Sequence, residues 1–165
     1  MTDNMPGGRM SMPESQPWNR TLNHALWRAT QAISRNLNAA LEQLGVTITQ
    51  LGMMVTLEQR GPCSAADLAR GHHITPQSVN TALHHLDQLA WITRSPHPVN
   101  KRIVLIDVTD RGRDGIAEGK RLVASVTAPA TEALGGAEPV DRLTQSLDQI
   151  TEALNLDWDR SAPRT

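Results

Sequence analysis

The sequence predicts a mainly α-helical protein that carries one small β-hairpin. Apolar residues recur every three or four positions over most of the chain, which is the period of a helix with one buried face. The period changes to alternation only between Arg102 and Val108, where β-branched residues are frequent. Hydrophobic residues make up 39% of the 165 residues and aromatic residues only 2%. This is enough apolar material for a core, and the core is expected to be aliphatic.

A long first helix is predicted between Trp18 and Gly45. Its apolar residues form one stripe at helical spacing: Leu22, Leu26, Ala29, Ile33, Leu37, Leu41 and Leu44. Glycine is the residue that most often follows the end of a helix, so Gly45 marks its end. At 1.5 Å per residue this helix is roughly 40 Å long, which is more than a small domain needs for its own core.

Three shorter helices are predicted next, each from a local start signal. Two of the signals are capping boxes, in which two polar residues three positions apart bond each other's backbone: Thr47 with Gln50, and Ser64 with Asp67. The third is Thr75 followed by Pro76, because proline suits the first position of a helix. The first of these helices is expected to end near Gly61, and the second near Arg70.

The third short helix has one apolar and one polar side. The apolar side consists of Val79, Ala82, Leu83, Leu86 and Leu89. The polar side consists of Gln77, Ser78, Asn80, Thr81, His84, His85 and Gln88. A hairpin is predicted after it, with strands at Trp91–Arg94 and Arg102–Val108 and a turn at Pro96–Asn100. Val104, Ile106 and Val108 are expected to share one face of the second strand.

Two further helices are predicted at the C-terminal end. Thr109 opens the first, from Asp110 to about Leu134, and Gly135-Gly136 ends it. The second spans about Val140 to Leu154. Its apolar residues form a narrow seam like that of a coiled coil: Val140, Leu143, Leu147, Ile150 and Leu154.

Two short helices joined by a tight turn and followed by a hairpin make a winged helix-turn-helix, and this arrangement suits DNA. An α-helix fits the major groove, where glutamine and asparagine can pair with adenine. The hairpin brings Arg94, His97, Lys101 and Arg102, which can hold phosphates regardless of sequence. The whole chain has a net charge of -1, but between Gly61 and Arg113 arginine and lysine outnumber acidic residues by six to four. The predicted DNA contacts are Ser64, Thr75, Pro76, Gln77, Ser78, Asn80, Thr81, His84, Arg94, His97, Lys101 and Arg102.

Five segments in this order resemble the MarR family of bacterial and archaeal regulators. They are Val46–Gln50, Gly61–Ala69, Ile74–Val79, the wing segment Arg94–Arg102, and Val108–Arg113. The sequence departs from the family pattern in two places. Asn100 stands where the family has an aspartate that holds the wing arginine, and His84-His85 stands where the family often has an acidic residue and an arginine.

The resemblance implies a homodimer whose first and last helices interlock, with two recognition helices about 34 Å apart on a pseudo-palindromic operator. The predicted dimerisation residues are Leu22, Leu26, Leu143, Leu147, Ile150 and Leu154. The family commonly binds small aromatic or phenolic effectors, so release of a repressor by such a molecule is expected. A cytoplasmic, nucleoid-associated protein of a prokaryote follows, with no cofactor and no role as an enzyme.

The domain organisation predicted on this basis has five parts. These are a flexible arm at 1–17, a dimerisation helix at 18–45, the winged helix-turn-helix at 46–109, C-terminal dimerisation helices at 110–158 and a flexible tail at 159–165. No run of 18 apolar residues and no apolar signal-peptide segment occur, so no membrane partner is expected.

Several residues have alternative interpretations. His24, Trp27, Met53 and Met54 are candidates for an effector pocket, although such residues are more often core filler. Cys63 is either a redox sensor or, as we expect, inert. The histidine pairs His72-His73 and His84-His85 suggest a zinc-responsive regulator of the same fold, but no cysteine cluster supports it, and no metal site is predicted. A winged helix used only for protein contacts is a further alternative, which the charged wing disfavours. An enzyme has no support, because the sequence lacks a phosphate loop and a nucleophile motif.

Overall fold

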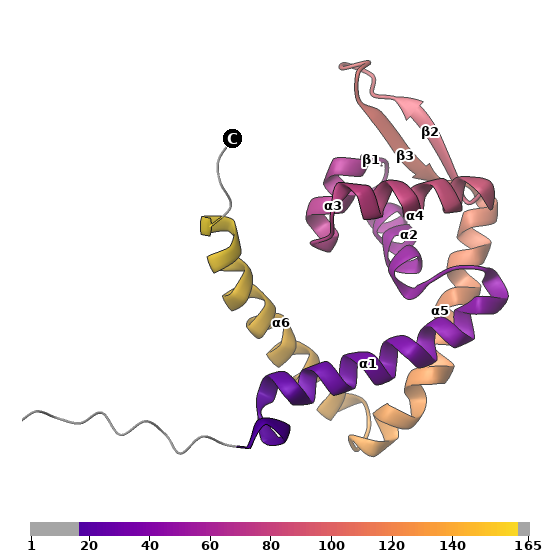
Figure 1. Ribbon diagram of the computed structural model, residues 1–165. Coiled ribbons are helices and arrows are strands. Elements are labelled where there is room, and N and C mark those ends of the chain that lie inside the picture. The colour runs from indigo at the N-terminus through magenta and orange to yellow at the C-terminus, as the bar shows by residue number, and fades with distance from the viewer. Residues whose placement is uncertain (1–16, 162–165) are drawn as a thin grey trace, which may run out of the picture. The chain divides into compact units, whose positions relative to one another are not determined.

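The computed structural model describes residues 17–161, with side chains through residue 154, and the fold is mainly helical with one small sheet (Figure 1). The elements in order are η1 (Trp18–Arg20), α1 (Leu22–Leu41), η2 (Glu42–Leu44), α2 (Ile48–Arg60), β1 (Cys63–Ser64), α3 (Ala65–His72), α4 (Pro76–Gln88), β2 (Ile92–Pro96), β3 (Val104–Val108), α5 (Asp110–Ala133) and α6 (Ala137–Ser161). The predicted fold class is therefore confirmed. The predicted arm at 1–17 lies outside the described residues apart from Pro17, and so does the end of the predicted tail.

The chain divides into two units, residues 1–35 and 36–165. The described part of the first unit consists of η1 and most of α1. The second unit begins within the last turns of α1 and contains all the other elements. Among the described residues, no helix is both long and apolar enough to cross a membrane.

The predicted start signals of the three short helices are all present as hydrogen bonds. The N–H of Gln50 donates to Oγ1 of Thr47 at 3.2 Å, and the N–H of Thr47 donates to Oε1 of Gln50 at 2.9 Å. Ser64 and Asp67 form the same reciprocal pair at the start of α3. Thr75 caps α4 by accepting from the N–H of Ser78 at 3.1 Å. These helices begin where local chemistry satisfies the otherwise unbonded N–H groups of their first turn.

The first and last helices differ from their predicted bounds. The predicted helix from Trp18 to Leu44 is shortened to Leu22–Leu41, with a 3-10 turn at each end, because Thr21 is extended and its hydroxyl bonds the carbonyl of Trp18 at 2.7 Å. The helix α6 begins at Ala137 instead of Val140, and it continues through Ser161, into the segment predicted as a tail.

The sheet has three antiparallel strands in the order β1-β3-β2, and the strand β1 was not predicted. In β1, Cys63 pairs with Ile106 and Ser64 pairs with Leu105. The strand bounds differ from the prediction in opposite directions, since β2 runs two residues further toward the tip, to Pro96, whereas β3 begins two residues later, at Val104. The strands project beyond the helices (Figure 1), so Val104 is 46% exposed while Ile106 and Val108 on the same face are buried. The prediction that Val104, Ile106 and Val108 share one face is confirmed, but no described helix packs on this face at Val104.

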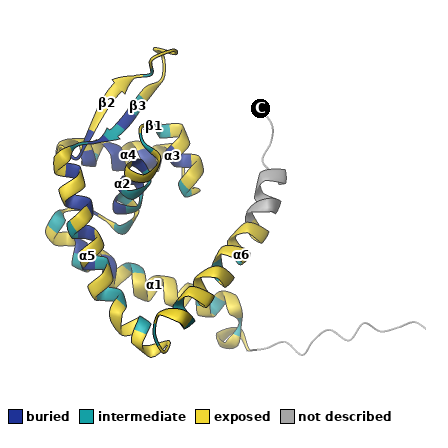
Figure 2. Ribbon diagram, turned by 180° about the vertical axis from the view of Figure 1, so that it is seen from behind, coloured by how far each residue is buried: buried dark blue, intermediate teal, exposed yellow. Residues whose placement is uncertain are grey.

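One core joins α2, α3, α4, the base of the sheet and the first half of α5. Buried residues concentrate on these elements, whereas α6 is mostly exposed (Figure 2). Three glycines bring α5 close to its neighbours: Gly112, Gly115 and Gly119. A Cβ atom on Gly115 would lie 2.4 Å from the indole of Trp91, and one on Gly119 would lie 2.7 Å from Leu51. The core therefore holds the wing base and the helix-turn-helix as one body.

Candidate nucleic-acid interface

The side of α4 that faces away from the core exposes all of the DNA contacts that the sequence predicted on this helix. The apolar side of the helix is buried through Val79, Ala82, Leu83 and Leu86. The opposite side leaves these side chains exposed: Pro76, Gln77, Ser78, Asn80, Thr81 and His84. Amphipathic spacing thus fixes which face of α4 is turned away from the core.

The exposed polar side chains of α4 differ in how far they are already engaged. The hydroxyls of Thr75 and Ser78 lie 2.8 Å apart, and the hydroxyl of Thr81 donates to the carbonyl of Gln77 at 3.0 Å. The side-chain amides of Gln77 and Asn80 have no hydrogen bond to any other described residue. Both amides retain a donor and an acceptor for an outside partner, which is the pair of groups that adenine recognition requires.

Between α2 and α4 lies a groove of about 550 Å³ that the sequence did not predict. Three of the exposed α4 residues line it, together with polar residues at the start of α2: Thr47, Thr49 and Gln50. Buried Met53 contributes to its apolar floor. The start of α2 therefore shares a surface with the reading face of α4.

At the start of α3, Ser64 is tied to an acidic side chain. The hydroxyl of Ser64 donates to Oδ2 of Asp67 at 2.6 Å, and Arg70 forms an ion pair with the same carboxylate. The hydrogen bonds from Ser64, with the charge of Arg70, lower the pKa of Asp67, so this carboxylate stays ionised near neutral pH. The hydroxyl and the backbone N–H of Ser64 both donate to Asp67, so a phosphate contact by Ser64 would require one of these donors to leave the carboxylate.

The wing carries its basic residues in two different states. Nε of Arg94 donates to Oδ2 of Asp87 on α4 at 3.1 Å, which ties the wing base to the end of the recognition helix. At the tip, Lys101 and Arg102 are exposed, and neither forms an ion pair with a described carboxylate. The tip therefore has positive charge available for phosphates, whereas Arg94 is already partly neutralised.

The side chain of Asn100 bonds the backbone of the wing arginine, Arg102, and not its guanidinium. Its Oδ1 accepts from the backbone N–H of Arg102 at 3.2 Å, and the guanidinium is left exposed. His97, predicted as a backbone anchor, directs Nδ1 at the backbone of the tip, where it accepts from the N–H groups of Val99 and Asn100.

Three further histidines each have a local partner. His84 lies 3.2 Å from Nε2 of Gln88, and Nε2 of His85 lies 2.6 Å from the carbonyl of Gly45, beyond the end of α1. Nε2 of His72 lies 3.0 Å from the hydroxyl of Thr56. Burial, with the nearby charge of Arg60 and His73, lowers the pKa of His72. Within residues 17–154, no three His, Cys, Asp or Glu side chains gather as a metal site would require.

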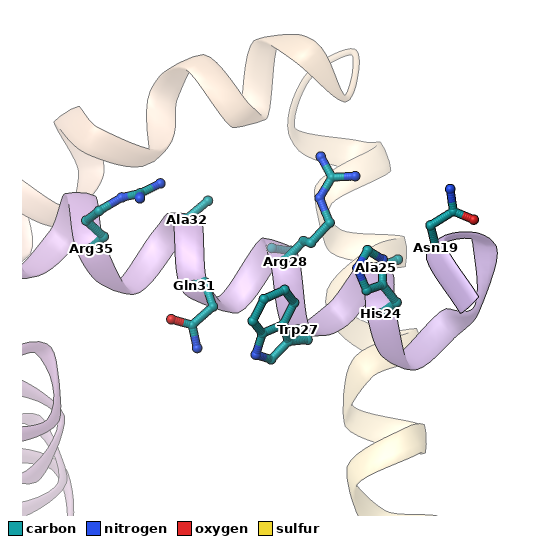
Figure 3. Close-up of a pocket in the computed structure, with 9 residues that line it drawn as sticks. Asn19, His24, Ala25, Trp27, Arg28, Gln31, Ala32 and Arg35 are labelled. Carbon is teal, nitrogen blue, oxygen red and sulfur yellow. The ribbon is translucent and has the colours of Figure 1, made fainter. Parts of the chain in front are cut away.

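The four candidate effector residues fall in different surroundings. His24 and Trp27 line a hollow of about 590 Å³ on the first unit, together with Asn19, Arg28, Gln31 and Arg35 (Figure 3). The ring of His24 lies 5.8 Å from that of Trp27, and its Nδ1 is buried without a partner among the described residues. Met53 and Met54 are buried and belong to the core of the second unit. For both methionines the structure supports the core interpretation.

Cys63 lies on the short strand β1, half-buried. Burial and the neighbouring charge of Asp67 raise the pKa of its thiol, while Arg60 opposes the shift. The reactive thiolate is therefore scarce at neutral pH, which agrees with the expectation of an inert cysteine.

Sequence reasoning found the local features of this surface and missed the contacts between distant residues. The pair Asp87 and Arg94 lies across two elements, and the pairing of β1 with β3 spans about forty residues. Neither leaves a periodic trace in the sequence.

A recognition helix with an exposed polar face, preceded by a capped helix and followed by a basic hairpin, defines a winged helix-turn-helix transcriptional regulator. The MarR family model matches residues 46–104. The HTH-type transcriptional repressor Rv2887 of Mycobacterium tuberculosis is 33% identical over 107 residues, which cover 65% of this chain and 75% of that protein. The chain belongs to the MarR family, and it is a DNA-binding regulator and not an enzyme.

Solved structures share the fold at lower identity. The repressor CouR bound to a 23-mer DNA duplex has a TM-score of 0.74 and 22% identity, covering 83% of this chain and 99% of CouR. BpsR of Bordetella bronchiseptica has a TM-score of 0.69 and 21% identity, covering 84% of this chain and 97% of BpsR. The DNA binding of BpsR is regulated by 6-hydroxynicotinic acid. At these identities the similarity concerns the fold.

Proposed function

We propose that the protein is a homodimeric repressor that binds a pseudo-palindromic operator and is released by a small aromatic effector. The observation that carries the proposal is the exposed polar face of α4, on which the amides of Gln77 and Asn80 bond no other described residue, together with a wing tip with exposed Lys101 and Arg102. The similar protein Rv2887 is named as a repressor. A cytoplasmic, nucleoid-associated location in a prokaryote belongs to the same proposal.

The contacts are divided between base reading and backbone holding. Pro76, Gln77, Ser78, Asn80 and Thr81 read base edges in the major groove. The phosphate contacts are Ser64, Thr75, His84, Arg94, His97, Lys101 and Arg102. We expect Lys101 and Arg102 to contribute most of the salt-dependent affinity, because Arg94 shares its charge with Asp87.

Dimerisation is supported by apolar side chains that the single chain leaves exposed. Leu22 is 61% exposed and Leu154 is 67% exposed, while Leu143 is 44% exposed. Leu26, Leu147 and Ile150 are half-buried. Large exposed apolar groups at helical spacing favour burial against a partner.

The charges of the terminal helices support the same partner. Between Pro17 and Leu41 the chain has three arginines and no acidic residue. Between Ala137 and Leu154 it has four acidic residues and one arginine. Opposite charges favour pairing of the first helix with the last helix over pairing of like helices, as the interlocked dimer that we propose requires.

An aromatic effector is supported by the hollow that contains His24 and Trp27. The ring of His24 lies 6.0 Å from that of Trp18 and 5.8 Å from that of Trp27. Arg28 and Arg35 line the same hollow as His24 and Trp27. Aromatic rings with adjacent cations suit a small aromatic molecule. We include Met53 and Met54 only as core residues that support the helix-turn-helix.

The proposal is tested by selecting genomic fragments bound by the full chain, with and without candidate phenolic ligands. Size-exclusion chromatography with light scattering measures the oligomeric state of the 18.1 kDa chain, and a salt titration measures the number of phosphate contacts. A monomer without salt-sensitive affinity for any duplex would refute it and favour a protein-interaction module. Metal analysis of the purified protein, followed by binding with and without zinc, decides the zinc-responsive alternative.

A further inference from the structure

The tip of the wing, residues 97–103, is held together by side chains of its own sequence. Nδ1 of His97 accepts hydrogen bonds from the backbone N–H groups of Val99 at 3.2 Å and of Asn100 at 3.1 Å. The backbone N–H of His97 donates to the carbonyl of Ile103 at 2.8 Å, which closes the hairpin. The imidazole thus lies inside the turn and acts as its internal acceptor.

This geometry determines the protonation state of the ring. Two N–H groups that point at the same nitrogen require a lone pair on it, so Nδ1 is unprotonated and the proton resides on Nε2. An imidazolium carries a proton on both nitrogens and cannot accept either bond. Protonation of His97 is therefore incompatible with the turn that the structure contains.

Loss of the hydrogen bonds to His97 would affect the basic residues of the tip through Asn100. The N–H of Asn100 is one of the two donors to His97, while Oδ1 of Asn100 accepts from the N–H of Arg102 at 3.2 Å. His97, Asn100 and Arg102 thus form one chain of hydrogen bonds. When the first acceptor is lost, the N–H groups of Val99 and Asn100 lose their partner, while the N–H of Ile103 still donates to the carbonyl of Asn100 at 2.9 Å. The backbone that carries Lys101 and Arg102 is then held by fewer bonds and is less restricted in conformation.

We propose that His97, which keeps its Nε2–H for the phosphate contact proposed above, is also a positioning residue that orders the wing tip only while its imidazole is neutral, so that protonation of this ring weakens DNA binding. The proposal rests on the proposed DNA-binding function. It has the opposite sign from the expectation based on charge alone, in which an added positive charge next to phosphates strengthens binding.

The charged groups around the tip do not offer the imidazolium a new partner. Lys101 and Arg102 on the tip have the same sign, and Arg94 at the wing base is paired with Asp87 of α4. On β3, Asp107 accepts from the N–H of Val108. Among the described residues, no carboxylate bonds the ring of His97, so the lost acceptor is not replaced by an ion pair.

The test compares operator affinity of the full chain and two variants at pH 7.5 and 5.5. In His97→Asn, the amide oxygen can accept from the N–H two residues later, as in an Asx turn, but does not titrate. His97→Ala removes the acceptor. Since the other histidines are common to all three proteins, the ratio of wild-type to His97→Asn affinity isolates the effect of His97.

We expect the ratio of wild-type to His97→Asn affinity to be about three- to tenfold lower at pH 5.5 than at pH 7.5, as the loss of one or two hydrogen bonds predicts. We expect His97→Ala to bind the operator weakly at both pH values. A ratio that is constant or that rises in acid would overturn the proposal. The proposal would also be overturned if His97→Ala bound the operator as tightly as the wild type at pH 7.5.

A second measurement needs no DNA. Nitrogen-15 NMR of the free protein reports which ring nitrogen of His97 is protonated, and the amide signals of Val99 and Asn100 should shift together with its titration. A proton on Nδ1 at pH 7.5 would overturn the proposal even if DNA binding is demonstrated. If no duplex binds at any pH, the proposed function fails, and the role of His97 in DNA binding fails with it, while the NMR still shows whether the turn is built as described.

Discussion

At the scale of single residues, Gln77 and Asn80 differ from the other exposed groups of α4 because their amides are unbonded within the described chain. We expect Gln77→Ala to narrow the difference in affinity between the correct operator and an operator with one changed base by about 1–3 kcal/mol. Competition binding against matched duplexes measures this difference. If the difference stays constant, Gln77 does not read a base.

Arg102 should behave differently, because a phosphate contact carries no sequence information. We expect Arg102→Ala to weaken binding to operator and random DNA by a similar factor and to reduce the slope of log affinity against log salt by about one. Lys120→Ala is the control, since Lys120 pairs with Glu58 away from the wing. An unchanged salt slope would exclude Arg102 from the phosphate contacts.

His72 makes the stability of the helix-turn-helix depend on pH. Burial lowers the pKa of His72 below its ordinary value of 6.5, so the unfolded state binds more protons than the native state in this window. The contribution of His72 is therefore present above pH 6.5 and is lost as the pH falls through the lowered pKa. Urea unfolding measures the free energy of unfolding of the wild type and of His72→Gln. As the pH falls, we expect the wild type to lose more of this free energy than the variant. A difference independent of pH would contradict this sign.

At the scale of elements, α5 depends on glycines where it crosses Trp91. The Cβ atom of Gly115→Ala would meet the buried indole at 2.4 Å, and a rigid ring in a packed core cannot yield cheaply. We expect a loss of about 1–3 kcal/mol in the free energy of unfolding. Gly52→Ala in α2 is the matched control, because its Cβ meets only His72 at 3.6 Å. Equal stability of the two variants would mean that the indole adapts.

Elements were predictable from sequence where their cause is local. Thr47 with Gln50, Ser64 with Asp67, and Thr75 with Pro76 mark helix starts because capping acts across three residues. The exposed face of α4 follows from its helical period. In contrast, the strand β1 exists only because Cys63 meets Ile106, and Arg94 meets Asp87 only after the hairpin has folded onto α4. The inward acceptor role of His97 was equally hidden, since a histidine in a basic segment is predicted to be another cation.

At the scale of the whole molecule, the proposed dimer depends on side chains that one chain cannot bury. We expect Leu143→Glu to shift the protein from dimer toward monomer and to reduce operator affinity more than tenfold, since two linked heads bind far more tightly than one. Light scattering gives the mass, and circular dichroism checks that the helices remain. Gln145→Glu adds the same charge to α6 outside the apolar seam, and it should leave the dimer intact. If Leu143→Glu also remains a dimer, the seam is not the contact.

The two-residue strand β1 has a mechanical consequence. It links the start of α3 to the middle strand of the wing by backbone hydrogen bonds, while the ion pair of Arg94 and Asp87 fastens the other edge of the hairpin to α4. The helix α4 and the hairpin are therefore both attached to the same core. We expect a displacement of this core to move α4 and the wing together, so that the DNA contacts proposed for both should be lost in a single step.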